Sequence, residues 1–370
     1  MFNDELKEFI KTECGTECIG IASVHDMTDK ELTDIAEMNR ILSDYTPMYS
    51  SDTPVLQLSE FLDDAKCCIV MAININFGEK ELPGNPPRSE IMNFYVNPDS
   101  LNYFVERAQK VVGFLEEKGY SGFSLNAGIS QKLISARSSI LRYGRNAIVQ
   151  SPEMGSMIGI MLIITDAPLE IDDPLKGDCG DCTLCRDACP TGALNESYVC
   201  DIEKCLTMHM IYNKKDLPKD IREKAGTIIA HCNECVNACP KNRNLPIQTG
   251  ISQPEDLVYP EIAPLVNMSD EKYAEMFDGT FLEFTLLDKK YLQRNAAVAL
   301  GNYGDPVYVP VLAEALEIQA EDIVRGHAAW ALGRIGSADA KKVLENFLGK
   351  ESSSEVKAEI EYALNMCSQG

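Results

Sequence analysis

The sequence CGDCTLCRDACP occupies residues 179–190, and CNECVNACP follows at residues 232–240. The first run has the spacing CxxCxxCxxxCP, in which three thiolates bind one [4Fe-4S] cluster and the fourth reaches a second cluster. The second run is one cysteine short of that pattern. Two such clusters need eight thiolates and the two runs hold seven, so a cysteine between them is expected to supply the eighth. Cys205 is the favoured candidate and Cys200 the less favoured one.

The pattern predicts that the two runs exchange ligands. The first cluster is expected to bind Cys179, Cys182, Cys185 and Cys239, and the second to bind Cys189, Cys205, Cys232 and Cys235. Each cluster would then join segments that are distant in the sequence. Structural zinc sites and disulfides are the alternatives. CxxC pairs alone would suit zinc, whereas CxxCxxC with a proline after the fourth cysteine favours clusters.

Composition narrows the class of protein. The chain has 370 residues, 14 cysteines and a net charge of −23, and its length suits about two or three domains. The cysteine content favours a reducing compartment in which thiolates bind metals. No apolar run reaches the roughly 18 residues of a membrane span, and the first residues lack the features of an export signal. We therefore expect a soluble cytoplasmic protein. Nucleic acid is an unlikely main partner, because phosphate binding relies on clustered Lys and Arg.

Residues 1–170 are expected to form an α/β domain in which helices cover a sheet. Short apolar runs rich in β-branched residues predict buried strands at 17–24, 67–75 and 157–166. Residues 102–119 carry apolar side chains at helical spacing, and Gly119 can end that helix. Cys67 and Cys68 lie in an apolar stretch and are expected to be core residues.

The rest of the chain divides into three parts. Residues 171–245 should form the ferredoxin-like cluster domain, with little regular structure, and residues 246–287 a connector. From residue 288 to 370 the sequence repeats: QRNAAVALGNYGD (293–305) matches RGHAAWALGRIGS (325–337) at an offset of 32 residues. This period predicts a short HEAT-like α-solenoid, with His327 and Trp330 as packing residues. Two roles remain open for it: a docking surface for a protein partner, or a helical cap.

This order of parts resembles the epoxyqueuosine reductase family, which is related to the reductive dehalogenases. The likeness is closest over residues 135–242, which include both cysteine runs and Cys205. The resemblance implies a cobalamin near one cluster, on a nitroreductase-like α/β scaffold, and a low-potential donor such as ferredoxin or flavodoxin. YGRNAIVQSPEMGS (143–156) resembles a family stretch beside the cofactor. It implies four cobalamin-binding residues: Arg145, Asn146, Gly155 and Ser156.

The resemblance breaks in the half of the protein that would bind substrate. The family carries a catalytic aspartate in a short Asp-Ser-Ala-Pro-like motif, whereas SLNAGISQKLISAR (124–137) has none; Leu125 and Asn126 are nearest. Neither residue can replace an aspartate as a general acid. The segments that border the family's cofactor pocket offer other candidates for the proton donor, namely Tyr95, Asp99, Tyr143 and His209. For each of them the plain alternative is a packed side chain without chemistry.

The leading hypothesis is a cytoplasmic, cobalamin-dependent iron–sulfur oxidoreductase that reduces a substrate other than tRNA epoxyqueuosine. Electrons would pass through the two clusters to the corrinoid, which performs chemistry that side chains cannot. One alternative is epoxyqueuosine reductase itself with a displaced acid. Another is an electron-transfer or corrinoid-reactivating protein that docks a partner on the solenoid. A third is a degenerate family member that has clusters but no cofactor pocket.

Overall fold

The computed structural model describes residues 2–16, 18–24, 28–47, 61–78, 84–125 and 131–368. Their contacts group them into two compact units. Unit 1 contains residues 1–78, 99–201 and 233–251, and unit 2 contains residues 79–98, 202–232 and 252–370. The division into ranges that end at 170, 245, 287 and 370 stays a prediction. Among the described residues, none of the helices combines the length and the apolar character that crossing a bilayer requires.

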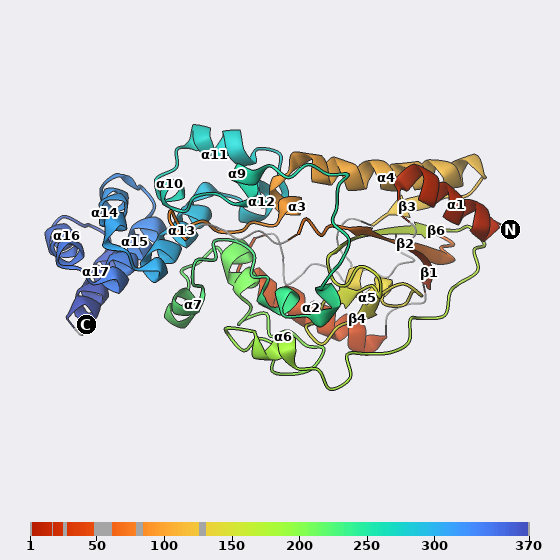
Figure 1. Ribbon diagram of the computed structural model, residues 1–370, viewed down its shortest axis with the longest axis horizontal. Coiled ribbons are helices and arrows are strands. Elements are labelled where there is room, and N and C mark those ends of the chain that lie inside the picture. The colour runs from red at the N-terminus through yellow and green to blue at the C-terminus, as the bar shows by residue number, and fades with distance from the viewer. Residues whose placement is uncertain are drawn as a thin grey trace. The chain divides into compact units, whose positions relative to one another are not determined.

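A four-stranded sheet forms the centre of unit 1 (Figure 1). Its strands run in the order β1 (Ile19–Ser23), β2 (Cys67–Asn74), β6 (Ile158–Thr165) and β3 (Gly122–Ser124), and every neighbouring pair is antiparallel. The three apolar runs are therefore confirmed as strands, and β3 is an addition at the edge. Cys67 and Cys68 are completely buried in β2, as expected for core residues.

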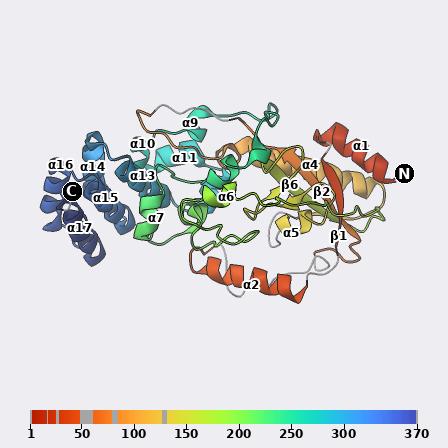
Figure 2. The same ribbon diagram turned by 60° about the horizontal axis from the view of Figure 1, so that its bottom comes forward.

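Helices cover both faces of this sheet. Helices α1 (Phe2–Cys14) and α4 (Pro98–Glu117) lie along one face, and α5 (Gln131–Ser135) lies on the other (Figures 1 and 2). The predicted apolar stripe of α4 is confirmed, since Val111 and Leu115 are completely buried. Gly119 follows this helix with φ of 83°, a conformation in which glycine avoids the strain of a side chain. Unit 1 also contains helix α2 (Asp29–Ser43). This helix starts with a capping box formed by Thr28 and Glu31.

The cluster segment contains only short elements, as its sequence predicts. In unit 1 these are α6 (Leu184–Asp187), α8 (Glu234–Asn237) and a 3₁₀ turn at Pro240–Asn242, and a small sheet of β4 (Arg142–Tyr143) and β5 (Val149–Gln150) precedes the segment. In unit 2 they are a π-helix, η2 (Met208–Tyr212), and α7 (Lys219–Lys224). Helices α6 and α8, one from each cysteine run, pack against each other. The two runs therefore meet although more than forty residues separate them.

Unit 2 is helical. It begins with α3 (Asn93–Val96), and its connector residues form α9 (Glu255–Val258), α10 (Ala263–Val266), α11 (Asp270–Phe277) and α12 (Phe281–Leu286). The solenoid follows as α13 (Lys289–Tyr303), α14 (Val309–Ile318), α15 (Asp322–Ile335), α16 (Ala338–Leu348) and α17 (Ser354–Cys367). The predicted packing residues are confirmed, because Trp330 is 0% and His327 1% exposed.

The offset of 32 residues has a direct packing cause. A Cβ atom built on Gly301 would lie 2.7 Å from the Cα of Ala331, and one built on Gly333 would lie 2.7 Å from the Cα of Ala363. Each pair joins successive inner helices, α13 to α15 and α15 to α17. The helices approach so closely that only a hydrogen atom fits at these glycines. The repeat in the sequence is therefore a repeated close helix contact.

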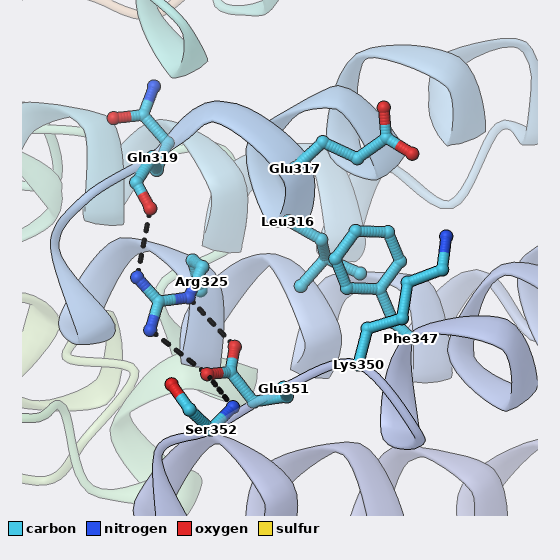
Figure 3. Close-up of a pocket in the computed structure, with 8 residues that line it drawn as sticks. All are labelled: Leu316, Glu317, Gln319, Arg325, Phe347, Lys350, Glu351 and Ser352. Atoms are coloured by element: carbon cyan, nitrogen blue, oxygen red, sulfur yellow. Dashed lines mark hydrogen bonds and ion pairs between the residues drawn. The ribbon is translucent and has the colours of Figure 1, made fainter.

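A cavity of about 490 Å³ lies in the solenoid (Figure 3). Its charged centre is Arg325, whose Nε donates to the Glu351 carboxylate at 2.8 Å. Its Nη1 donates to the Gln319 carbonyl at 2.9 Å. The guanidinium thus links α15 to the loop before α17 and to the end of α14. We interpret it as a structural cross-link of the repeats.

We predict that Gly301→Ala lowers the stability of the protein. The added methyl would overlap the backbone of Ala331, and overpacking of this kind costs about 1–3 kcal/mol. Gly326→Ala in α15 is the matched control, since a Cβ there would lie 3.7 Å from the nearest atom, the Cγ of the Glu359 side chain, which is an ordinary contact distance. Denaturant unfolding of the cluster-loaded protein should show a lower midpoint for Gly301→Ala alone. Equal midpoints would contradict the packing argument.

Candidate functional site

Four of the predicted cluster ligands, those of the first cluster, come from unit 1 and lie near one another. Burial raises the pKa of the Cys185 thiol, and charge interactions with Cys239, Cys179 and Cys182 raise it further. Those three sulfurs are therefore close enough to act on Cys185 electrostatically. Four thiolates in one place repel one another, and binding to iron removes that cost. The proximity supports the predicted ligand set.

These four cysteines are expected to bind a cluster and not a single ion. Among the described residues, no three His, Cys, Asp or Glu side chains form a group that could hold one metal ion. The charges of three other cysteines act on Cys185, so four cysteine side chains interact with one another here. In a [4Fe-4S] cluster each thiolate binds a different iron, so the four sulfurs surround a whole cubane.

Residues of β5 and of the loop after it contact the segments that carry these cysteines. Gln150 is buried, and its Nε2 donates to the Cys179 sulfur at 3.5 Å. The backbone N–H of Ser156 donates to Asn242 Oδ1 at 2.8 Å. Gly155 has φ of 55°, and a Cβ there would lie 2.1 Å from the same oxygen. In this structure Gly155 and Ser156 therefore hold the chain just after Cys239.

The segment 142–150 contains buried polar atoms that have no partner among the described residues: Arg142 Nε, Arg145 Nε and Gln150 Oε1. Asn146 is buried as well, with its Oδ1 accepting from the Ile148 N–H at 3.4 Å. Unpaired buried polar atoms are costly unless a bound group pairs with them. The amide side chains around a corrin ring could supply such partners, so this segment fits the predicted cofactor.

The predicted ligands of the second cluster are divided between the units. Cys189 and Cys235 belong to unit 1, while Cys205 and Cys232 belong to unit 2. Within unit 2 the two cysteine segments are bonded to each other, because the Cys232 N–H donates to Thr207 Oγ1 at 3.0 Å. The Cys205 carbonyl accepts from the His209 N–H at 3.2 Å and starts the helical turn that leads into η2. This ligand set stays a prediction.

The candidate proton donors differ in their surroundings. Asp99 is exposed in the first turn of α4, and Tyr143 packs against the core of unit 1. Tyr95 lies in α3 of unit 2, with its ring centroid 4.0 Å from that of His231. Asp99 and Tyr143 thus belong to one unit and Tyr95 to the other. Of the residues nearest to the missing aspartate, Leu125 is buried and Asn126 lies outside the described residues.

His209 is the candidate that the structure makes least available. It is 1% exposed, its Nε2 lies 2.7 Å from the Glu203 carbonyl, and its Nδ1 lies 3.3 Å from the Asn213 amide nitrogen. Burial lowers its pKa, which favours the neutral ring. Both ring nitrogens are therefore occupied by protein atoms. This geometry favours a packed side chain.

The structure adds residues that the sequence argument missed. His231 precedes Cys232, is buried, and has two ring nitrogens without a partner among the described residues. Burial lowers the pKa of His231 to about 3, so the ring is neutral at ordinary pH.

Arg294 and Asn295 are completely buried in α13. The available signal was a polar Gln-Arg-Asn triplet inside an alanine-rich helix.

Comparisons with known proteins agree with this architecture. A family model for the 4Fe-4S double cluster binding domain matches residues 178–242, and a model for HEAT repeats matches residues 284–365. The first match establishes two [4Fe-4S] clusters as the metal cofactors. The epoxyqueuosine reductase of Bacillus anthracis is 32% identical over 270 residues, which cover 71% of this chain and 70% of that protein.

Solved structures give the same result. An epoxyqueuosine reductase from Bacillus subtilis, seen with its aspartate-bearing catalytic loop swung out of the active site, has a TM-score of 0.88 at 26% identity. That match covers 99% of this chain and 98% of the other. An epoxyqueuosine reductase with an epoxyqueuosine-modified tRNA stem loop has a TM-score of 0.89 at 26% identity, with 99% of each chain covered. The chain therefore belongs to the epoxyqueuosine reductase family and is an iron–sulfur oxidoreductase.

Proposed function

We propose that this protein passes low-potential electrons through its two clusters to a corrinoid, and that it reduces a substrate other than tRNA epoxyqueuosine. The observation that supports the electron path best is the proximity of Cys185 to Cys179, Cys182 and Cys239. The corrinoid is supported by the unpaired buried polar atoms of residues 142–150. The substrate proposal rests on the missing aspartate between residues 124 and 137.

In this proposal the side chains of the protein bind the clusters and the corrinoid and orient them. When bound, the clusters supply one-electron transfer and the corrinoid supplies a cobalt centre for the reduction. The Gln150 amide donates to the Cys179 sulfur, and hydrogen bonds to cluster sulfurs are among the factors that set the reduction potential. Arg145 and Asn146 would pair with amides at the corrin edge. Gly155 and Ser156 would act indirectly, by holding the chain after Cys239.

A tyrosine is the proton donor that fits this chain best. Leu125 cannot donate a proton, Asp99 is exposed to solvent, and His209 is occupied by protein partners on both sides. Tyr95 and Tyr143 remain, and each sits in a segment that borders the family's cofactor pocket. Tyr95 also interacts by a hydrogen bond with Tyr212, and burial raises the pKa of Tyr212, so the Tyr212 phenol stays protonated. A protonated phenol is the form that a donor requires.

Epoxyqueuosine reductase activity is the second candidate, and the relatives favour it. The reductase solved with a tRNA stem loop has the same fold as this protein, and the match covers 99% of this chain. That finding weakens our expectation that nucleic acid is an unlikely partner. The net charge of −23 still opposes binding to phosphates. The same charge would repel an acidic ferredoxin and suits a more basic electron donor.

The ligand sets predict iron contents. Anaerobically reconstituted protein should carry about eight irons, four for each cluster. Cys185→Ser and Cys205→Ser should each retain about four, with the loss of two different EPR signals. Cys200→Ser is the matched control for the choice of the eighth ligand and should retain all eight. Loss of a cluster in Cys200→Ser with a full content in Cys205→Ser would overturn that choice.

The corrinoid proposal predicts that the cluster-loaded protein binds cob(II)alamin and changes its EPR spectrum. Arg145→Met should weaken binding, because it removes the donors that pair with the cofactor. Arg334→Met serves as control, since Arg334 is an exposed residue of the solenoid. Anaerobic titration followed by absorption and EPR measures the affinity. Protein with both clusters but without corrinoid binding would contradict this part of the proposal.

The substrate proposal predicts that the gene fails to restore queuosine in a bacterial strain that lacks its own epoxyqueuosine reductase. The measurement is the ratio of epoxyqueuosine to queuosine in digested tRNA. A relative that carries the aspartate is the positive control, and the cluster content of the expressed protein must be confirmed. Restoration of queuosine would establish the second candidate instead.

A further inference from the structure

One buried side chain of α13, Asn295, bridges the two pieces of unit 2 that carry predicted cluster cysteines. Its Nδ2 donates to the carbonyl oxygens of Met210 and Ile229, each at 2.7 Å. Met210 lies shortly after Cys205 in the sequence, and Ile229 lies shortly before Cys232. One amide group therefore sets the separation between the two backbones. The two segments are also bonded directly through Thr207 and the Cys232 N–H, at 3.0 Å.

The neighbouring residue, Arg294, holds the end of the π-helix η2. Its guanidinium donates at 2.7 to 3.1 Å to three carbonyl oxygens, those of His209, Asn213 and Lys215. Carbonyls at the C-terminal end of a helix lack intrahelical partners and carry partial negative charge, which a cation stabilises. The Nε of Arg294 donates to Asn295 Oδ1 at 3.0 Å and orients that amide toward its two acceptors.

Both side chains are completely buried, so water cannot replace their hydrogen bonds. Removing the Asn295 amide would leave two carbonyl oxygens buried and unpaired, which is costly. The least costly response would be a shift of the two segments that lets water in. Such a shift would change the separation of Cys205 and Cys232 directly.

We infer that Asn295, oriented by Arg294, is a positioning residue for the second cluster. The inference rests on the proposed ligand set, in which Cys205 and Cys232 bind that cluster. It assigns the first solenoid helix a task inside the electron path: α13 holds together the two segments that carry two of the four predicted ligands. Two roles were open for the solenoid, a docking surface and a helical cap. This inference is a form of the second role, in which the cap also positions cluster ligands.

The chain contains a matched control on the same helix. Asn302 of α13 also donates through Nδ2 to two carbonyl oxygens, those of Arg222 at 2.7 Å and Gly226 at 3.0 Å. These carbonyls belong to α7 and the turn after it, which Figure 2 shows beside α13. They lie farther along the chain from both cysteines. The two asparagines share their donor chemistry and differ in the segment they hold and in burial, since Asn295 is completely buried and Asn302 only partly.

The experiment compares Asn295→Ala, the milder Asn295→Ser and Asn302→Ala in the full, anaerobically reconstituted chain. The readouts are iron per chain, the EPR signals of the reduced clusters, and the rate of iron loss to a chelator. Cys205→Ser identifies the signal of the second cluster. We expect both Asn295 variants to lose that cluster's iron roughly tenfold faster or more, the ratio that one lost buried hydrogen bond implies. Asn302→Ala should behave as the parent protein.

The signal of the first cluster reports the folding of unit 1, because all four of its predicted ligands belong to that unit. Denaturant unfolding of unit 2, with Asn302→Ala as reference, shows whether the Asn295 variants keep unit 2 folded. Selective loss of the second cluster in the Asn295 variants supports the inference. Equal loss of both clusters, equal loss in Asn302→Ala, or unchanged second-cluster stability in Asn295→Ser would overturn it. Failure of the ligand set itself gives a different result, namely eight irons in Cys205→Ser.

Discussion

Binding of thiolates to iron is the interaction on which the middle of this chain depends. The segment between residues 178 and 242 has short helices, and its two cysteine runs at 179–190 and 232–240 contain no buried apolar side chain, so packing alone gives these runs little stability. Its eight predicted ligands come from both cysteine runs and from Cys205 between them. The predicted crossed ligation would turn two local motifs into long-range connections, and the stability of the cysteine runs would then follow metal occupancy.

The features that sequence reasoning predicted are those with a local or periodic cause. The spacing of the cysteines, the stripe of α4 and the repeated Ala-Leu pairs each need only a short window of sequence. The cause of the 32-residue period was less visible. It is a backbone contact of Gly301 and Gly333 with the next inner helix, and nothing in either glycine alone indicates which neighbour it approaches.

Other features depend on partners that are far apart in the chain. The antiparallel order of the sheet brings β2 between β1 and β6, and apolar runs contain no information about strand direction. Arg294 and Asn295 bind carbonyl oxygens more than sixty residues away, and a carbonyl has no sequence signature. Gly155 and Ser156 matched a family stretch, yet in the structure their contact is with Asn242.

The division of the second ligand set between two units has a consequence for the order of cofactor insertion. Cys205 and Cys232 lie on segments whose hydrogen bonds, through Thr207 and Asn295, need no metal. Under the predicted ligand set, the metal-free chain would present this pair of thiols as a preformed half-site. A scaffold protein that hands over a cubane would therefore have to recruit only Cys189 and Cys235. Fewer residues lose conformational freedom at that moment, which lowers the entropic cost of capture.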